Sequence, residues 1–207
     1  LHDALPIFQK EAIRGIADHG LEVITGGPGT GKTTIIKCIL AMLDKAGQKV
    51  LMAAPTGRAA KRMTETTGIE SKTIHRLLDL GITDDGEDIE GDEQLNCDVV
   101  IIDEASMIDV LLMNNLLAAL KPSTRLILVG DADQLPSVGP GRVLSDIISS
   151  GACRVVKLEM IYRQGSESLI TLNAHRINGG EEPKINQKDG DFFFINSKDS
   201  TNTKEKL

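Results

Sequence analysis

The sequence predicts an α/β domain in which a mostly parallel sheet carries helices on both faces. Short apolar runs alternate along the chain with longer segments whose apolar residues recur at helical spacing. The apolar runs lack the alternation of half-exposed strands, which is typical of parallel strands covered on both sides. The chain has 207 residues, 41% of them hydrophobic and 26% charged, so one core can form without disulfides or structural metals.

The predicted strands are the short apolar runs, at residues 21–25, 49–54, 99–102, 126–129, 155–158 and 192–195. The predicted helices share apolar side chains at a 3.6-residue period, shown most clearly by Ile35, Ile39 and Leu43. They lie at residues 32–46, 57–66, 73–80, 110–120, 142–149 and 167–178. An acidic segment at residues 81–96 interrupts this rhythm and is expected to be a solvated loop or a small hairpin.

Charge and composition exclude several classes of protein. The net charge of −7 does not attract nucleic acid, so such a partner requires a local basic patch. With four Phe, one Tyr and no Trp, recognition through many stacked aromatic rings is not expected. Cys38, Cys97 and Cys153 are odd in number and widely spaced, which favours a reducing cytosol. The sequence shows neither a membrane span nor a secretory signal, which predicts a cytoplasmic protein without a membrane partner.

A phosphate-binding loop is the most specific motif. Residues 26–33 read GGPGTGKT and match the pattern G-x-x-x-x-G-K-[ST] between a predicted strand and a predicted helix. Glycines allow consecutive backbone N–H groups to surround phosphate oxygens, and the helix adds the positive end of its dipole. Lys32 is expected to reach the β- and γ-phosphates of ATP, and the Thr33 hydroxyl is expected to bind Mg²⁺.

A second motif is the apolar strand at residues 99–102, which ends in Asp103 and Glu104. Ligands of open α/β sheets bind beyond the carboxyl ends of the strands, so both carboxylates are expected beside the phosphate-binding loop. Asp103 is predicted to hold Mg²⁺ directly or through water, and Glu104 to orient and deprotonate the attacking water.

Three further segments bear on function. Arg58, Lys61 and Arg62 are spaced to share one helix face, and together with Thr56 they could bind a nucleic-acid phosphate; a solvated helix face is the alternative. Gln134 follows a strand and could sense the γ-phosphate, unless this is an ordinary turn. Arg163 could stabilise transition-state charge, with a surface salt bridge as the alternative.

Taken in order, these segments resemble the first motor domain of superfamily-one DNA helicases, especially the RecD-like group of exodeoxyribonuclease V alpha subunits. The resemblance runs from about residue 8 to residue 195. The segments that carry it are GGPGTGKTT (26–34), APTGRAAKRM (54–63), TIHRLL (73–78), DVVIIDEASM (98–107), LVGDADQLPSVGPG (128–141), YRQ (162–164), NAHRIN (173–178) and GDFFFI (190–195).

The resemblance implies a RecA-like, three-layer P-loop NTPase fold and assigns roles to residues. It makes Gln9 the adenine-reading glutamine, stacks Tyr162 on the base, and places Arg163 on the γ-phosphate. It extends the ATP site over Gly27, Pro28, Gly29, Thr30, Gly31, Lys32, Thr33 and Thr34. Single-stranded DNA would follow Pro55, Thr56, Arg58, Thr73 and His75, although His75 could instead be a packed or capping residue.

The resemblance further implies one motor domain at residues 8–197, with an inserted loop or hairpin at 81–96 and unstructured ends at 1–7 and 198–207. The family's second motor domain is not recognisable in the sequence, so we expect a fragment of a 5′-to-3′ helicase that acts in DNA repair or recombination. Subunits of a helicase–nuclease complex would be further partners.

Two other functions fit the phosphate-binding loop. A nucleotide switch or a small-molecule kinase that does not act on DNA could use the same loop, but a kinase needs an acceptor pocket and a lid with additional arginines. A degenerate motor domain could serve as a scaffold, but that reading requires broken catalytic residues. Lys32, Thr33, Asp103, Glu104 and Gln134 are all intact.

Overall fold

The computed structural model describes residues 19–78, 94–158, 168–185 and 190–193. They fall into two compact units, Leu1–Met160 and Ile161–Leu207, which are described one at a time. Most of the acidic segment at 81–96 and both predicted unstructured ends lie outside the described residues. Of that segment only residues 94–96 are described; there the Leu95 N–H donates to the Ala119 carbonyl at 2.8 Å.

The first unit is built on a six-stranded sheet in which every strand pair is parallel, in the order β3-β2-β4-β5-β1-β6. The strands are β1 (Leu21–Gly26), β2 (Val50–Ala54), β3 (Ser71–Thr73), β4 (Val99–Ile102), β5 (Arg125–Gly130) and β6 (Arg154–Leu158). Parallel strands bring their carboxyl ends to one edge of a sheet. The segments after β1, β2, β4 and β5 therefore meet at that edge.

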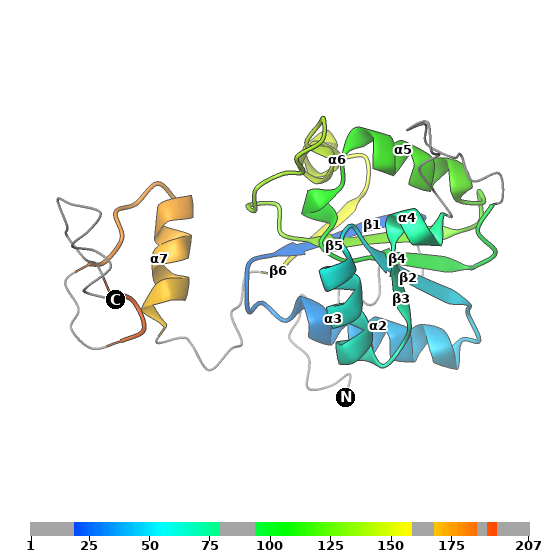
Figure 1. Cartoon of the computed structure of the whole chain (residues 1–207), viewed down its shortest axis with the longest axis horizontal. Helices are drawn as coiled ribbons and strands as arrows, with labels where there is room; N and C mark the ends of the chain where they lie inside the picture. Colours follow the sequence, from blue (N-terminus) through cyan, green and yellow to red (C-terminus); the bar gives the residue numbers. More distant parts are fainter. Residues whose placement is uncertain (1–18, 79–93, 159–167, 186–189, 194–207) are drawn as a thin grey trace, which may run out of the picture. The chain divides into compact units, whose positions relative to one another are not determined.

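Helices cover both faces of the sheet (Figure 1). Side chains of α2 (Lys32–Lys45) and α3 (Gly57–Thr67) pack in the hydrophobic cluster on one face. Side chains of α4 (Ile74–Leu77), α5 (Val110–Ala119) and α6 (Val143–Ser150) pack in the cluster on the other face. β4 contributes Val99 and Ile101 to the first cluster and Val100 and Ile102 to the second, so all four of its residues are buried. The predicted α/β fold with a doubly covered parallel sheet is confirmed.

Three elements differ from the sequence prediction. β3 was not predicted, because its residues, Ser71–Thr73, are polar, and it forms through parallel pairing with β2. The predicted helix at 73–80 is a single turn, α4, among the described residues. Of the predicted strand at 192–195, Phe192 and Phe193 are described and lie outside any strand, and Phe193 is exposed.

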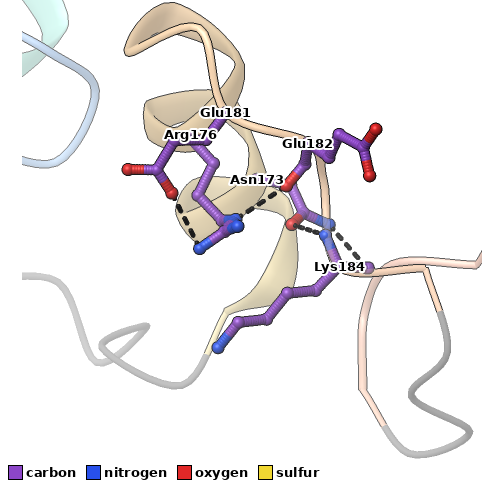
Figure 2. A network of polar contacts seen from close by, with 5 residues as sticks. All are labelled: Asn173, Arg176, Glu181, Glu182 and Lys184. Atoms are coloured by element: carbon purple, nitrogen blue, oxygen red, sulfur yellow. Dashed lines mark hydrogen bonds and ion pairs between the residues drawn. The ribbon is translucent and has the colours of Figure 1, made fainter.

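The second unit contains α7 (Leu169–Asn178), which is held at both ends by polar side chains. Asp191 accepts hydrogen bonds from the backbone N–H groups of Leu169 and Ile170, and its pKa is lowered by hydrogen bonds, chiefly that from the Ser168 hydroxyl. Farther along the helix, Asn173 in its middle makes two hydrogen bonds to the backbone of Lys184, and Arg176 near its carboxyl end binds Glu181 and the carbonyl of Glu182 (Figure 2). These contacts fold residues 181–185 back along the helix.

Candidate nucleotide-binding site

The loop after β1 has the backbone that its glycines predict. Gly29 and Gly31 have φ angles of 81° and 90°, a left-handed region that favours glycine. Gly26 lies so close to β6 that a Cβ atom there would be 2.9 Å from the Leu158 carbonyl oxygen. Thr30 is buried, and its hydroxyl donates to the Gly27 carbonyl at 2.9 Å. The loop is therefore tightly folded before any ligand binds.

Lys32 is the first residue of α2, and its side chain folds back over the loop. Its Nζ atom donates to the carbonyl oxygens of Gly26 and Gly27, the latter at 3.1 Å. Gly31, the N-cap residue of α2, has no side chain to cap the helix, and among the described residues no side chain accepts from the N–H groups of its first turn. An anion over this loop would give those N–H groups an acceptor and Lys32 a stronger, charged partner.

Asp103 follows β4 and is held by its neighbours. Its N–H donates to the Ala53 carbonyl at 3.0 Å, and its Oδ1 accepts from the Glu104 N–H at 2.9 Å. Burial raises the pKa of the Asp103 carboxyl, and the Glu104 charge adds to this. The hydrogen bond from Glu104 and the positive charges of Lys32 and Arg62 act in the opposite direction. The fold thus brings Lys32 and Asp103, far apart in the sequence, within electrostatic reach of each other.

Glu104 has an unusual backbone conformation. It has φ 53° and ψ 39°, and among the described residues no other non-glycine residue has a positive φ. Such a conformation costs about 1–2 kcal/mol in a residue with a side chain, and strain of this kind is concentrated at functional sites. Glu104 caps the short 3₁₀ helix Ala105–Met107, whose Met107 N–H donates to the Glu104 carbonyl at 3.1 Å.

Gln134 lies in the loop that leaves β5, the strand between β1 and β4. The Ala132 N–H donates to the Thr25 hydroxyl at 3.1 Å, which ties the start of this loop to the end of β1. The Gln134 N–H donates to the carbonyl of the buried Asp131 at 3.2 Å, while the Gln134 side chain is exposed. The start of the loop is thus fixed beside the phosphate-binding loop at the carboxyl end of β1, and the exposed Gln134 side chain is accessible to a ligand.

The residues predicted to contact DNA follow β2 and β3. Thr56 caps α3 by accepting from the Ala59 N–H at 3.3 Å, and Thr73 caps α4 by accepting from the Arg76 N–H at 3.2 Å. Thr73 is paired with Ala54 across the β2–β3 ladder, so the segments after these strands are neighbours. Arg58 and His75 are exposed and Pro55 is half-buried. His75 is therefore not packed in the core, and the residue that caps the start of α4 is Thr73.

Two of the three basic residues of α3 have identified neighbours. Arg62 is near enough to Asp103 to lower the pKa of its carboxyl. Lys61 instead lines a hollow beside β3 together with Lys72 and Arg76, two basic residues that the sequence analysis did not single out. They were missed because they lie in two different short elements, β3 and α4, and no sequence spacing relates them to Lys61.

Gln9, Tyr162 and Arg163 lie outside the described residues, as does the segment 79–93. Their roles, and the domain limits at residues 8 and 197, therefore stay predictions. Within the described ranges, no group of three or more His, Cys, Asp or Glu side chains is placed to hold a metal ion. Nor is any helix in those ranges long and apolar enough to cross a membrane.

Together, a glycine-rich loop that leads from strand to helix, an acidic strand end beside it and an all-parallel sheet define a P-loop nucleotide-binding domain. Residues 9–140 match the family model described as the AAA domain, and the chain belongs to this family. Membership of this family implies nucleotide binding.

The relatives include a protein named as a DNA helicase and proteins named as subunits of the RecBCD enzyme. The chain is 41% identical over 180 residues to the ATP-dependent RecD2 DNA helicase of Deinococcus radiodurans, a match that covers 87% of this chain and 25% of that protein. It is 38% identical to the RecBCD enzyme subunit RecD of Mycolicibacterium smegmatis, with 76% of this chain and 33% of the subunit covered. The chain thus spans about a quarter to a third of the length of these relatives.

A solved structure supports the fold. The crystal structure of the Pif1 helicase from Candida albicans superposes with a TM-score of 0.63 at 23% sequence identity, covering 87% of this chain and 45% of that chain. The predicted resemblance to RecD-like helicases is confirmed by the relatives, and the P-loop NTPase fold by this structure.

Proposed function

We propose that this chain is the ATP-binding and ATP-hydrolysing motor domain of a RecD-like 5′-to-3′ DNA helicase. The observation that carries the proposal is the convergence of Lys32 and Asp103 at one edge of the sheet, where burial raises the pKa of the Asp103 carboxyl and the positive charge of Lys32 partly offsets this rise. Relatives named as DNA helicases support the same function.

Each residue of the edge then has a chemical task. Lys32 would leave the loop carbonyls and neutralise the β- and γ-phosphates of ATP. The Thr33 hydroxyl and the Asp103 carboxylate are oxygen donors of the kind that Mg²⁺ prefers, and the half-buried Asp103 would gain a cation beside its charge. When bound, the ion would neutralise phosphate charge during hydrolysis.

Hydrolysis requires a base and a group that registers the γ-phosphate. Glu104, fixed by its strained backbone next to Asp103, would orient and deprotonate the attacking water. Gln134 would contact the γ-phosphate, and its loop is tied to β1 at one end. Loss of that phosphate would therefore change the contacts of the Gln134 loop at the same edge of the sheet that carries the segments after β2 and β3.

Single-stranded DNA would bind across Pro55, Thr56, Arg58, Thr73 and His75, at the ends of β2 and β3. In a complete motor, nucleotide-dependent changes at this edge of the sheet would alternately strengthen and weaken the binding of single-stranded DNA. Subunits of a helicase–nuclease complex are further candidate partners, because several relatives are named as subunits of the RecBCD enzyme.

A steady-state ATPase assay with and without single-stranded DNA tests the proposal. We expect Mg²⁺-dependent ATP binding, slow hydrolysis and no unwinding by this chain alone. The affinity for a short oligothymidylate should change when ATP is replaced by ADP. Nucleotide binding with no affinity for single-stranded DNA in any nucleotide state would contradict the helicase assignment and favour a nucleotide switch or a kinase.

A further inference from the structure

Ser106 carries a buried hydroxyl whose role the hydrolysis site described above does not explain. It lies in the 3₁₀ helix Ala105–Met107, two residues after Glu104, and is 8% exposed. Among the described residues, no group forms a hydrogen bond with its Oγ atom. A buried hydroxyl without a hydrogen bond destabilises the folded state, and an alanine at this position would avoid that cost. Packing alone therefore does not account for a serine here.

Close packing fixes the backbone of Ser106 against the end of β5. Gly130 is the last residue of β5, and a Cβ atom there would be 3.2 Å from the Ser106 backbone nitrogen and 2.9 Å from the Cδ2 atom of Leu144 in α6. A side chain on Gly130 would therefore crowd both neighbours. The 3₁₀ helix is thus held where the loop that carries Gln134 begins.

A small cavity makes Ser106 and Gln134 neighbours. Its polar lining residues are Ser106, Gln134, Arg142 and Ser145, and its volume is about 10 Å³. That volume is at the lower limit for one water molecule, so the residues around it lie close to one another. Gln134 and Arg142 are exposed, whereas Ser145 is half-buried. These three residues are therefore the candidate partners of the Ser106 hydroxyl.

Gln134 lies between two fixed points of its loop. Near the start of the loop, the Ala132 N–H donates to the Thr25 hydroxyl at 3.1 Å. Near its end, the Pro140 carbonyl accepts from the Val110 N–H at 3.0 Å. The backbone of the loop is thus held beside the cavity, and the exposed Gln134 side chain can change partners by rotation about its own bonds.

The chemistry of the three candidates favours Gln134 as the partner. The charge of Arg142 would have to leave water to bind a buried hydroxyl, which is costly. Ser145 lies within α6, where its short side chain has little freedom to move. The Gln134 amide is neutral, so its burial costs less. It also combines a carbonyl acceptor with an NH₂ donor, so it can bind Ser106 and a second group at once.

We propose that Ser106 is a positioning residue of the hydrolysis site, whose hydroxyl donates to the Gln134 amide carbonyl and holds the amide NH₂ toward the γ-phosphate. Phosphate oxygens accept hydrogen bonds, so only this orientation of the amide suits contact with the γ-phosphate. The inference rests on the proposed function and deepens it. The group that registers the γ-phosphate is thereby tied to the segment that carries Glu104, the proposed base, although Ser106 itself does not touch the nucleotide.

Single-turnover ATP hydrolysis by the whole chain tests this role, with Mg·ADP binding and urea unfolding measured on the same samples. Ser106→Ala should lower the rate constant of hydrolysis about tenfold, through the loss of one hydrogen bond. The Kd for Mg·ADP should not change, because ADP lacks the γ-phosphate. The variant should be at least as stable as the wild type, because alanine removes a buried hydroxyl without a hydrogen bond. Slower hydrolysis in an equally stable protein cannot arise from misfolding.

Ser145→Ala is the matched control, because it removes the other hydroxyl that lines the same cavity. Its rate constant should equal that of the wild type. Gln134→Ala changes an exposed residue, so it should fold normally, and it should lower the rate constant at least about tenfold. Because Ser106 acts through Gln134, the double variant Ser106→Ala/Gln134→Ala should be no slower than Gln134→Ala alone.

Three results would overturn the positioning role and leave the proposed function standing. The first is an unchanged rate constant in Ser106→Ala while the wild type hydrolyses ATP. The second is an equal loss in Ser145→Ala, which would show that packing around the cavity matters rather than the Ser106 hydroxyl. The third is a double variant whose losses multiply, which would show that Ser106 acts independently of Gln134. Absence of ATP hydrolysis by the wild type would overturn the proposed function as well.

Discussion

The two ends of β1 hold charge in different ways. At the carboxyl end, Lys32 and the half-buried Asp103 lie beside the loop, where the first N–H groups of α2 have no side-chain acceptor within the part of the chain that the structure describes. At the amino end, Glu22 is 1% exposed, and neither of its carboxylate oxygens accepts a hydrogen bond from the described residues. Its partner is Arg154 of β6, with Nε at 3.8 Å from the Glu22 Oε1.

The charged groups at the carboxyl end lie where a ligand could pair with them, whereas the buried Glu22 carboxylate is paired within the fold, with Arg154. The groups at the carboxyl end face a site where phosphates and a cation would satisfy them. Burial raises the pKa of Glu22 from 4.5 to about 7, and the Arg154 charge only partly offsets this. Substitution of Lys32 or of the other charged groups at the carboxyl end should therefore mainly change ATP binding or hydrolysis. Substitution of Glu22 should instead change the free energy of unfolding and leave ATP hydrolysis unaltered.

Lys32→Ala should have the largest effect on nucleotide binding. Loss of a charge-assisted contact to phosphate should weaken Mg·ATP binding about a hundredfold, while the thermal midpoint changes little because Lys32 is only half-buried. Isothermal titration calorimetry and thermal melts of the same samples measure both quantities. Lys37→Ala, on the same helix, is the control; equal ATP affinity in the two variants would break the comparison.

Glu104→Gln should abolish most hydrolysis and leave nucleotide binding intact. Removal of the general base should lower kcat by a factor of about 10² to 10⁴. Glu104→Gly should be equally inactive but more stable by about 1 kcal/mol, because glycine adopts a φ of 53° without strain. Single-turnover hydrolysis and urea unfolding check these outcomes. A glycine variant that is less stable than the glutamine variant would refute the strain at this residue.

Glu22→Gln should have the smallest effect on function and a pH-dependent effect on stability. Because the folded-state pKa is about 7 and the ordinary value is 4.5, the folded protein binds more protons than the unfolded chain between these values. Wild-type stability should therefore fall as pH rises from about 4.5 to about 7. The glutamine variant lacks this fall, so at about pH 8 it should be more stable by about 1–3 kcal/mol.

Urea unfolding of both proteins between about pH 5 and about pH 8 measures this difference. The ATPase rates of the two proteins should agree throughout. Parallel stability profiles for wild type and variant would mean that the Glu22 carboxylate carries no burial penalty, and the contrast between the two ends of β1 would disappear.

Sequence reasoning succeeded where neighbouring residues carry the signal. β4 has the predicted limits, because four apolar residues stand between Asp98 and Asp103. The phosphate-binding loop was predictable for the same reason, since its eight residues are contiguous and each has a backbone or side-chain task.

Features assembled from distant residues were not predictable. β3 is polar and exists because the edge of β2 is open to pairing. The cations that line the hollow beside β3, Lys61, Lys72 and Arg76, come from α3, β3 and α4, and nothing in their spacing relates them. Glu22 lies inside the predicted strand at 21–25, but nothing in its neighbours along the sequence singled it out. Its burial follows from the neighbouring strands β5 and β6, which flank β1 on both sides.

A crystal structure of the chain with Mg²⁺ and a non-hydrolysable ATP analogue tests the central claim most directly. We predict that Lys32 Nζ leaves the Gly26 and Gly27 carbonyls for the β- and γ-phosphates, with the ion between the Thr33 hydroxyl and the Asp103 carboxylate and with Glu104 facing the γ-phosphate. A nucleotide bound elsewhere, or a lysine still on the loop carbonyls with the carboxylates turned away, would contradict the account.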